Sequence, residues 1–465
     1  MESMWYGKPK RKLRIMSLEN ITRFFLLAGI VTHPIWSWSF KATFIPKPSD
    51  FFFILAIAGA LAYFYTKGRK DLFLVPRLLY AALFLFGASI ALGTAMGYIR
   101  YGIPVGGWHL VLYYLVRVGG GFILLLFSYI SLKDSFWFRK AIYGAFAASF
   151  LVFIPVLLMP GFWEKFSNEQ GRFFGLAGNA GMFAVLVFPS FVFAFFLLLR
   201  ALFSPYAKKS IFQLAPLAIL AIGLEMLILW SGTRSYFGAI ILTVVVGSAI
   251  LGRFYGFGLK KILVSTALMG FAAFLVLFLF PASVHRAGLL NQYPAYFQVA
   301  REQAEQIRHF AELQVRENNY EIPRAQLLTT QEPRLSGFQY YFSLLKADPL
   351  ILLFGVGINY EHKFSMPLLV GKGDMLAAGS VVFDPFLYGG IGAALGLLLL
   401  VWMILKRIML LFKVREEPVQ DPIYVLAPAI TLLGWWAAAI FMVTPIALIP
   451  NWILVAMTLA ITPKS

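Results

Sequence analysis

Arginines set between apolar stretches are the residues of this chain best suited to do chemistry. The clearest case is Arg234, which stands in Ser231-Gly-Thr-Arg-Ser235, a tight turn between two apolar runs. An arginine guanidinium is planar, always charged and matches two phosphate oxygens at once. A guanidinium held in such a turn at the rim of a membrane can bind the phosphate of a lipid-linked substrate. The competing interpretation is that it only binds lipid headgroups.

Two charged residues lie inside apolar runs, Arg117 and Glu225. Each would cost roughly 2.5–3.5 kcal/mol if it stood alone at the centre of a membrane helix. At 1.5 Å per residue, both lie roughly 12 Å below the same rim. Because pairing offsets the cost, we predict an Arg117–Glu225 contact. This pair either fixes helix packing or forms the floor of a substrate-binding cavity that opens outward.

Four residues are candidates for a general base: Asp384, His362, Glu361 and Asp374. Asp384 starts an apolar run and is followed by proline, so it also has a structural explanation as a helix cap. The histidines show no metal-ligand spacing, and the acids form no cluster typical of a divalent-cation site. We therefore expect no metal and no cofactor.

Glycines are dense between Gly389 and Gly396, inside an apolar run. Gly392 and Gly396 form a small-xxx-small pair, which predicts close packing against another helix. No Walker-type loop occurs in the chain, so a nucleotide-phosphate site is excluded.

The composition identifies the scaffold for these residues as an all-α integral membrane protein. The 465 residues are 60% hydrophobic, with a mean hydropathy of +0.77, which is beyond the range of soluble domains. Runs long enough to cross a bilayer core of about 30 Å recur throughout, and backbone polar groups in lipid must be satisfied within helices. We predict about twelve transmembrane helices, at residues 18–40, 50–66, 78–97, 109–132, 140–159, 180–203, 212–231, 236–252, 261–281, 383–405, 423–444 and 446–462.

Basic residues orient these helices. With the N-terminus inside, the Lys and Arg clusters of the short loops fall on the cytoplasmic side, as the positive-inside rule requires. Both termini are then cytoplasmic, and the first apolar run is a retained helix rather than a cleaved signal peptide. The formal charge of +19 reflects this orientation and not nucleic-acid binding. The absence of cysteine excludes disulfides, thiolate metal sites and a cysteine nucleophile.

The chain divides into three parts: 1–281 with spans one to nine, 282–382 as a large external loop containing helices, and 383–465 with spans ten to twelve. Loops of this length are usually functional. The external side receives a set of arginines that lie far apart in the chain, namely Arg100, Arg172, Arg234, Arg286 and Arg334. We therefore expect a cationic outer face.

Four stretches resemble the superfamily of bacterial O-antigen ligases and O-antigen polymerases. They are Arg172-Phe-Phe-Gly-Leu-Ala-Gly-Asn179; the turn around Arg234; Arg334 to Tyr341 with Asp348-Pro349 and Gly355-Val356-Gly357; and Asp384 with Gly389-Gly390-Ile-Gly392. The likeness covers about residues 170 to 410 and extends to the plan of about twelve helices. It implies a GT-C-like fold.

The resemblance also implies an activity, that of a metal-independent inverting glycosyltransferase in the bacterial cytoplasmic (inner) membrane. Such enzymes act in polysaccharide and lipopolysaccharide biosynthesis of the cell envelope, where they move a glycan from undecaprenyl diphosphate to an acceptor glycan or lipid A core. By this resemblance Arg234 and Arg334 stabilise the leaving diphosphate, with Arg172 and Arg286 as helpers. Asp384 or His362 is then the base. A flippase and a chain-length regulator are the implied protein partners.

The chain departs from the ligase pattern at two places. Ligases carry a histidine about eleven residues before the first glycine of the Gly389 cluster, where this chain has Ala378 and Gly379. Ligases also tend to have leucine where this chain has Gly238, shortly after Arg234. Both departures favour a polymerase or a divergent relative.

Two other classes of function fit parts of the sequence. A transporter or flippase for lipid-linked glycans, without transferase activity, predicts internal repeats and polar sites on both sides. The chain shows no repeat, and its cytoplasmic side has only short basic turns. A non-catalytic scaffold of envelope assembly would not require Arg234 in so tight a turn.

Overall fold

The computed structural model describes most of the predicted helices. The described residues are 17–34, 48–68, 70–104, 107–153, 180–203, 211–231, 233–255, 342–358, 384–413, 423–439 and 448–460, with short pieces at 263–264, 266–267, 269–271, 308, 312, 360, 366–367 and 374–375.

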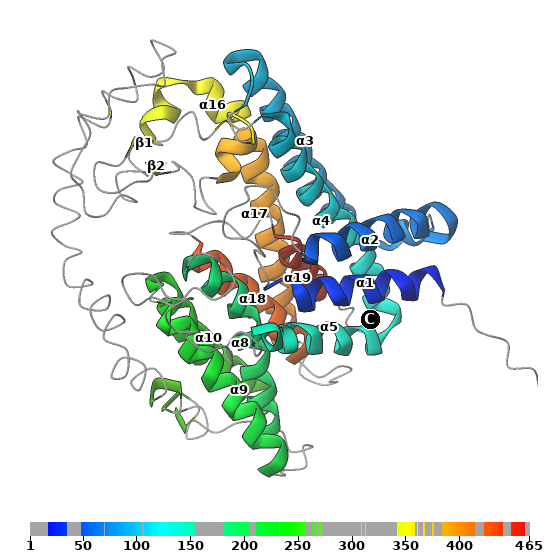
Figure 1. The fold of residues 1–465 in the computed structure, drawn as a ribbon, viewed down its shortest axis with the longest axis vertical. Helices are drawn as coiled ribbons and strands as arrows, with labels where there is room; N and C mark the ends of the chain where they lie inside the picture. The colour runs from blue at the N-terminus through cyan, green and yellow to red at the C-terminus, as the bar shows by residue number, and fades with distance from the viewer. Residues whose placement is uncertain are drawn as a thin grey trace, which may run out of the picture.

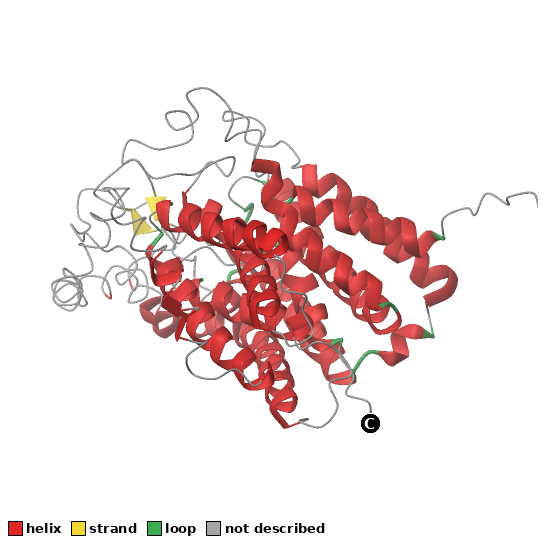
Figure 2. Cartoon of the chain, turned by 90° about the horizontal axis from the view of Figure 1, so that it is seen from below, coloured by secondary structure: helices red, strands yellow, loops and turns green. Residues whose placement is uncertain are grey.

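Nearly all of the described chain is helical (Figure 2). The longer helices are α1 (Leu18–Thr32), α2 (Pro48–Tyr63), α3 (Arg77–Tyr101), α4 (Trp108–Asp134), α5 (Phe136–Ala148), α8 (Ala180–Phe203), α9 (Ile211–Trp230), α10 (Arg234–Tyr255), α17 (Asp384–Lys413), α18 (Ile423–Ala438) and α19 (Ile449–Leu459). The shorter helices are η1 (Phe64–Gly68), η2 (Asp71–Leu74), η3 (Ser149–Phe153) and α16 (Pro349–Phe354). Two short strands, β1 (Met366–Pro367) and β2 (Asp374–Met375), pair antiparallel.

Six of the described helices are long and apolar enough to cross a membrane, and they lie in α2, α3, α4, α8, α10 and α17. Shorter apolar helices lie in α9, α18 and α19. Each longer helix begins within about one turn of the start of a predicted span. The chain is therefore a multi-pass helical membrane protein, which confirms the predicted class. The count of twelve spans and the extent of the external loop stay predictions.

Glycines allow α17 to pack closely along α3 (Figure 1). A Cβ atom on Gly396 would lie 2.7 Å from the backbone nitrogen of Phe86, and one on Gly392 would lie 2.2 Å from Ser89 Oγ. The close helix packing predicted for this glycine segment is confirmed. Since Gly389 lies beside Ile90 and Gly396 beside Phe86, the two helices run antiparallel.

Helix α17 is interrupted at Gly389 and Gly390, whose backbone angles are not helical. The loop after α16 fills the interruption, because the amides of Val356 and Gly357 both donate to the carbonyl of Leu387, at 2.6 and 3.1 Å. Gly390 has a φ of +63°, and a Cβ there would lie 2.2 Å from a backbone oxygen of α16. The break is thus packed with the chain's own backbone, which satisfies groups that lipid could not.

Contacts at one end of the helices define a first pole of the molecule. The ring of Tyr98 near the end of α3 contacts that of Trp108 at the start of α4, with ring centroids 5.3 Å apart. Asp50 near the start of α2 accepts a hydrogen bond from Tyr113 of α4 at 3.0 Å. The starts of α2, α4 and α17 therefore lie with the end of α3. We call this the Arg117 end.

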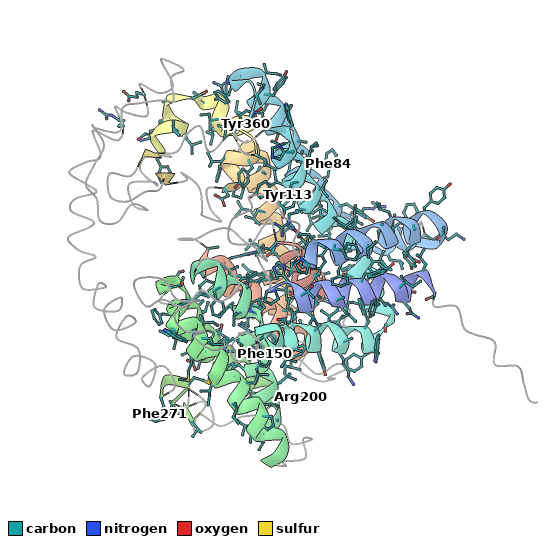
Figure 3. All side chains as sticks on the ribbon, in the orientation of Figure 1. Phe84, Tyr113, Phe150, Arg200, Phe271 and Tyr360 are labelled. Carbon is teal, nitrogen blue, oxygen red and sulfur yellow. The ribbon has the colours of Figure 1, made fainter. Side chains whose placement is uncertain are left out.

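The opposite pole holds the end of α4 and the start of α5. Lys133 Nζ donates to the carbonyl of the last residue of η2 at 3.1 Å, and Arg139 Nη1 donates to the carbonyl of Met457 in α19 at 3.4 Å. Arg200 near the end of α8 lies over the ring of Tyr424 at the start of α18, 5.9 Å from its centroid. We call this the Arg139 end. Tyr360 and Arg200, labelled in Figure 3, lie toward opposite ends of the molecule.

Helix α10 runs parallel to α8. The ring of Tyr236 lies 5.2 Å from that of Phe188, early in both helices. Farther along, a Cβ on Gly247 would lie 2.9 Å from the ring of Phe196. Because α8 ends at the Arg139 end, α10 begins at the Arg117 end, together with the starts of α4 and α17.

Candidate functional site

Arg234 is the first residue of α10 and lies at the Arg117 end. Helix α9 ends at Trp230, so the predicted tight hairpin is confirmed. Its hydroxyl groups, on Ser231 and Thr233, are buried and their oxygens lie 2.9 Å apart. The Ser231 hydroxyl also lies 2.6 Å from the carbonyl of Ile228. These local contacts allow α10 to begin directly after α9. The guanidinium of Arg234 lies outside the described side chains.

Asp384 is the first residue of α17 and lies at the same end. Its side chain is 1% exposed. A carboxylate in the first turn is favoured by the helix dipole. Proline is tolerated at position 385 because a backbone N–H in the first turn would have no acceptor within the helix. The structural role predicted for Asp384 therefore has a physical basis. The position also brings a carboxylate to the pole where Arg234 begins its helix.

The predicted Arg117–Glu225 contact is wrong. Arg117 Nη2 lies 3.4 Å from Asp50 Oδ1, and both side chains are buried. Helices α2 and α4 run side by side and in parallel, so the acid at the start of α2 reaches the guanidinium before α9 can. Asp50 was not predicted as the partner because this residue was expected at the start of a span. An acid at the membrane surface is not buried and does not need a cationic partner.

Asp50, Tyr113 and Arg117 form one polar cluster. Asp50 accepts from the Tyr113 hydroxyl, and the Arg117 guanidinium lies over the Tyr113 ring, 5.1 Å from its centroid. A buried charge pair gains from its mutual attraction only when further polar contacts satisfy the remaining atoms. The tyrosine supplies both a hydrogen bond to the acid and a ring face to the cation. The cluster forms a polar core under the Arg117 end.

Glu225 lies in the last turns of α9 and is 1% exposed. Its Oε2 atom has no hydrogen-bond partner among the described residues. An ionised carboxylate in that setting would be very unfavourable. Glu225 is therefore not the counter-ion of Arg117, and Asp50 takes the position that was predicted for it.

The segment after residue 341 is fixed to the Arg117 end by polar contacts. Arg100 near the end of α3 forms an ion pair with Asp348, which also accepts from the amide of Leu350 at 3.0 Å and so caps α16. The Tyr360 hydroxyl donates to the carbonyl of Gly102 at 2.8 Å. Burial and the nearby Tyr98 raise the pKa of Tyr360. Arg100, expected as one cation of the outer face, is thus matched with an acid.

Several predicted site residues lie outside the described part of the chain: Arg172, Arg286, Arg334, Glu361 and His362. Asp374 is described as part of β2, paired with Pro367 of β1. Within the described residues, no group of three His, Cys, Asp or Glu is placed to hold a metal ion. The described part of the site therefore contains the start of α10, the start of α17 and the Asp50 cluster.

No protein-family model, no curated protein and no solved structure matches the chain.

Proposed function

We propose that the protein is a membrane glycosyltransferase of the O-antigen polymerase or ligase type. In this proposal it lies in the bacterial cytoplasmic membrane with about twelve spans and both termini inside. It moves a glycan from undecaprenyl diphosphate to an acceptor glycan, or to lipid A core, on the outer face. The residues 282–382 then form an external loop that contributes Arg286, Arg334 and His362.

One observation carries the proposal. The starts of α10 and α17, which bring Arg234 and Asp384, lie at the same pole as the buried Asp50–Arg117 cluster. A cation and an acid from distant parts of the chain are what transfer from a diphosphate donor requires, because charge grows on the leaving group while a proton leaves the acceptor.

The contacts at the two poles support the proposed orientation. Residues predicted outside, such as Arg100 and Asp348, contact each other at the Arg117 end. Residues predicted inside, such as Lys133, Arg139 and Arg200, all lie at the Arg139 end. The cytoplasmic side in this proposal is therefore the Arg139 end, and the reaction takes place at the Arg117 end.

In the proposed reaction the acceptor hydroxyl oxygen attacks the anomeric carbon of the donor glycan. The bond from that carbon to the diphosphate oxygen breaks on the opposite face, which inverts the configuration. The hydroxyl proton passes to Asp384 or His362. The diphosphate leaves with the electron pair of the broken bond, and the guanidiniums of Arg234 and Arg334 stabilise its charge, with Arg172 and Arg286 as helpers.

The test is product formation by the purified protein in liposomes with a defined undecaprenyl-diphosphate oligosaccharide. We expect Arg234→Lys to lower the rate about 100-fold or more, because the single ammonium of lysine cannot replace the two parallel N–H donors of the guanidinium. Arg253→Lys, in the last turn of the same helix at the Arg139 end, is the matched control and keeps the wild-type rate. Wild-type synthesis by Arg234→Lys would contradict the phosphate role.

A transporter of lipid-linked glycans is the second candidate, and the break in α17 favours it, since transporters bind substrates at interrupted helices. In this protein, however, backbone of residues 353–357 packs against the break. The same liposomes separate the two candidates. Transfer of the labelled donor across the bilayer without formation of a longer glycan would support the transporter and contradict the transferase.

A further inference from the structure

Arg139 and Arg407 lie at the Arg139 end with buried Nε atoms, and no acid among the described residues forms an ion pair with either arginine. They differ in this from Arg23, which lies over the ring of Phe138 at the same end and forms an ion pair with Glu19. Buried cations in proteins are nearly always paired. The missing counter-charge therefore needs an explanation.

Arg139 is held inside the helix bundle. It lies in the first turn of α5 and is 1% exposed. Its Nη1 atom donates to the carbonyl of Met457 in the last turns of α19, and its Nε atom has no hydrogen-bond partner in the described chain. The carbonyls that end α19 carry a partial negative charge, about half an elementary charge. This offsets part of one guanidinium charge and leaves the rest.

Arg407 brings a second charge to the same place. It lies on α17 and is half-buried as a whole, but its Nε atom is buried and no described group bonds to that atom. Helix α17 contacts α19, to which Arg139 donates its hydrogen bond, and the positive charge of Arg407 repels that of Arg139. Tyr129 of α4 lies near Arg407, and the Tyr129 ring lies under the ammonium of Lys133, which is 4.7 Å from its centroid. Arg139, Arg407 and Lys133 thus bring three positive charges to the Arg139 end.

We propose that Arg139 and Arg407 together bind a phosphate group at the Arg139 end of the molecule. Two guanidiniums present donors in forks that fit phosphate oxygens. Basic pockets between membrane helices on the cytoplasmic side are a known way to bind anionic headgroups. The phosphate is that of an anionic lipid or a free phosphate ion. The site lies at the pole opposite the proposed reaction and does not depend on it.

Thermal unfolding of the purified full-length protein in a neutral detergent tests this. The additions are phosphatidylglycerol, inorganic phosphate and, as the uncharged comparison, phosphatidylcholine. We expect phosphatidylglycerol or phosphate to raise Tm, while phosphatidylcholine does not. A rise with phosphatidylglycerol alone identifies a lipid headgroup; a rise with both identifies a site for the phosphate group itself.

Arg407→Gln is the main variant, since Arg139 is so buried that its loss could prevent folding. We expect this variant to bind the stabilising ligand about tenfold or more weakly, from the lost charged hydrogen bonds. Lys406→Gln removes the same charge from the exposed neighbouring position and keeps the wild-type affinity. Equal weakening by both variants would indicate a diffuse charge effect and overturn the proposal. No rise in wild-type Tm with either ligand, as when carboxylates of the chain itself fill the site, would overturn it as well.

Discussion

At the scale of single residues, the buried charges of the Arg117 end follow two different physical solutions. Asp50 and Arg117 offset the cost of their burial by pairing, and Tyr113 contacts both side chains. Glu225 has no such partner among the described side chains, so burial favours its neutral form. The Arg117 end therefore holds one buried acid paired with an arginine and one buried acid without a described partner.

Replacing Asp50 with asparagine should destabilise the protein strongly. The variant leaves the Arg117 guanidinium buried without its acid, which costs about 3–5 kcal/mol in comparable sites. Tyr113→Phe removes only one hydrogen bond of the cluster and should cost about 1–2 kcal/mol. Thermal unfolding in detergent measures both. If the Tm of Asp50→Asn equals or exceeds that of Tyr113→Phe, the ion pair does not stabilise the protein.

Replacing Glu225 with glutamine should behave in the opposite way. Glutamine keeps the shape and removes a carboxyl group that has no described partner to lose, so we expect Tm to stay the same or rise. Measurement beside Asp50→Asn makes the comparison direct. A fall in Tm as large as that of Asp50→Asn would reveal a cationic partner for Glu225 and would contradict the neutral assignment.

At the scale of elements, the sequence predicts where helices begin better than it predicts which helices pack against one another. Apolar length and hydropathy are local properties, so the starts of α3, α4, α8 and α10 agree with the predicted spans. The prediction that the glycines of α17 allow close packing against another helix was correct. That α3 is the helix packed there, and that α17 breaks at Gly389, depend on tertiary contacts with residues 353–357, which no local pattern encodes.

The same limit applies to the candidate site. The tight turn before Arg234 was predicted correctly because a turn between two apolar runs is visible in the sequence. The partner of Arg117 was not, since Asp50 and Glu225 are both acids near a helix end and only helix neighbours distinguish them. The position of a residue along its helix can be predicted from the sequence, whereas the helices that lie beside it depend on tertiary packing.

The contact of α3 with α17 and α16 gives a prediction at this scale. A Cβ on Gly93 would lie 2.3 Å from the carbonyl oxygens of Phe354 and Tyr388, both backbone atoms that cannot move alone. Gly93→Ala should therefore lower stability by about 1–3 kcal/mol or more. Gly119→Ala, in open space on α4, should stay within about 0.5 kcal/mol of wild type. Equal Tm values for the two variants would contradict the packing described for α3.

At the scale of the whole molecule, the two poles differ in charge. The Arg117 end holds acids matched to arginines, in the Asp50 cluster and the Arg100–Asp348 pair. The Arg139 end holds Lys133, Arg139 and Arg407, for which no acidic partner lies among the described residues. An excess of cations at one pole is the pattern that fixes a membrane protein with that pole inside. The proposed glycan transfer and the proposed phosphate site of Arg139 and Arg407 therefore lie at opposite poles.

Single cysteines can test this sidedness, because the chain has no cysteine of its own. Ile103, just after α3 at the Arg117 end, is 68% exposed, and Phe73 in η2 at the Arg139 end is 89% exposed. We expect a membrane-impermeant maleimide to label Ile103→Cys in intact cells. Phe73→Cys should react only after the membrane is permeabilised, which also shows that the thiol is reactive. Labelling of both positions from the same side would contradict a bundle whose poles face opposite compartments. The reverse pattern would put the reaction proposed for the Arg117 end on the cytoplasmic face.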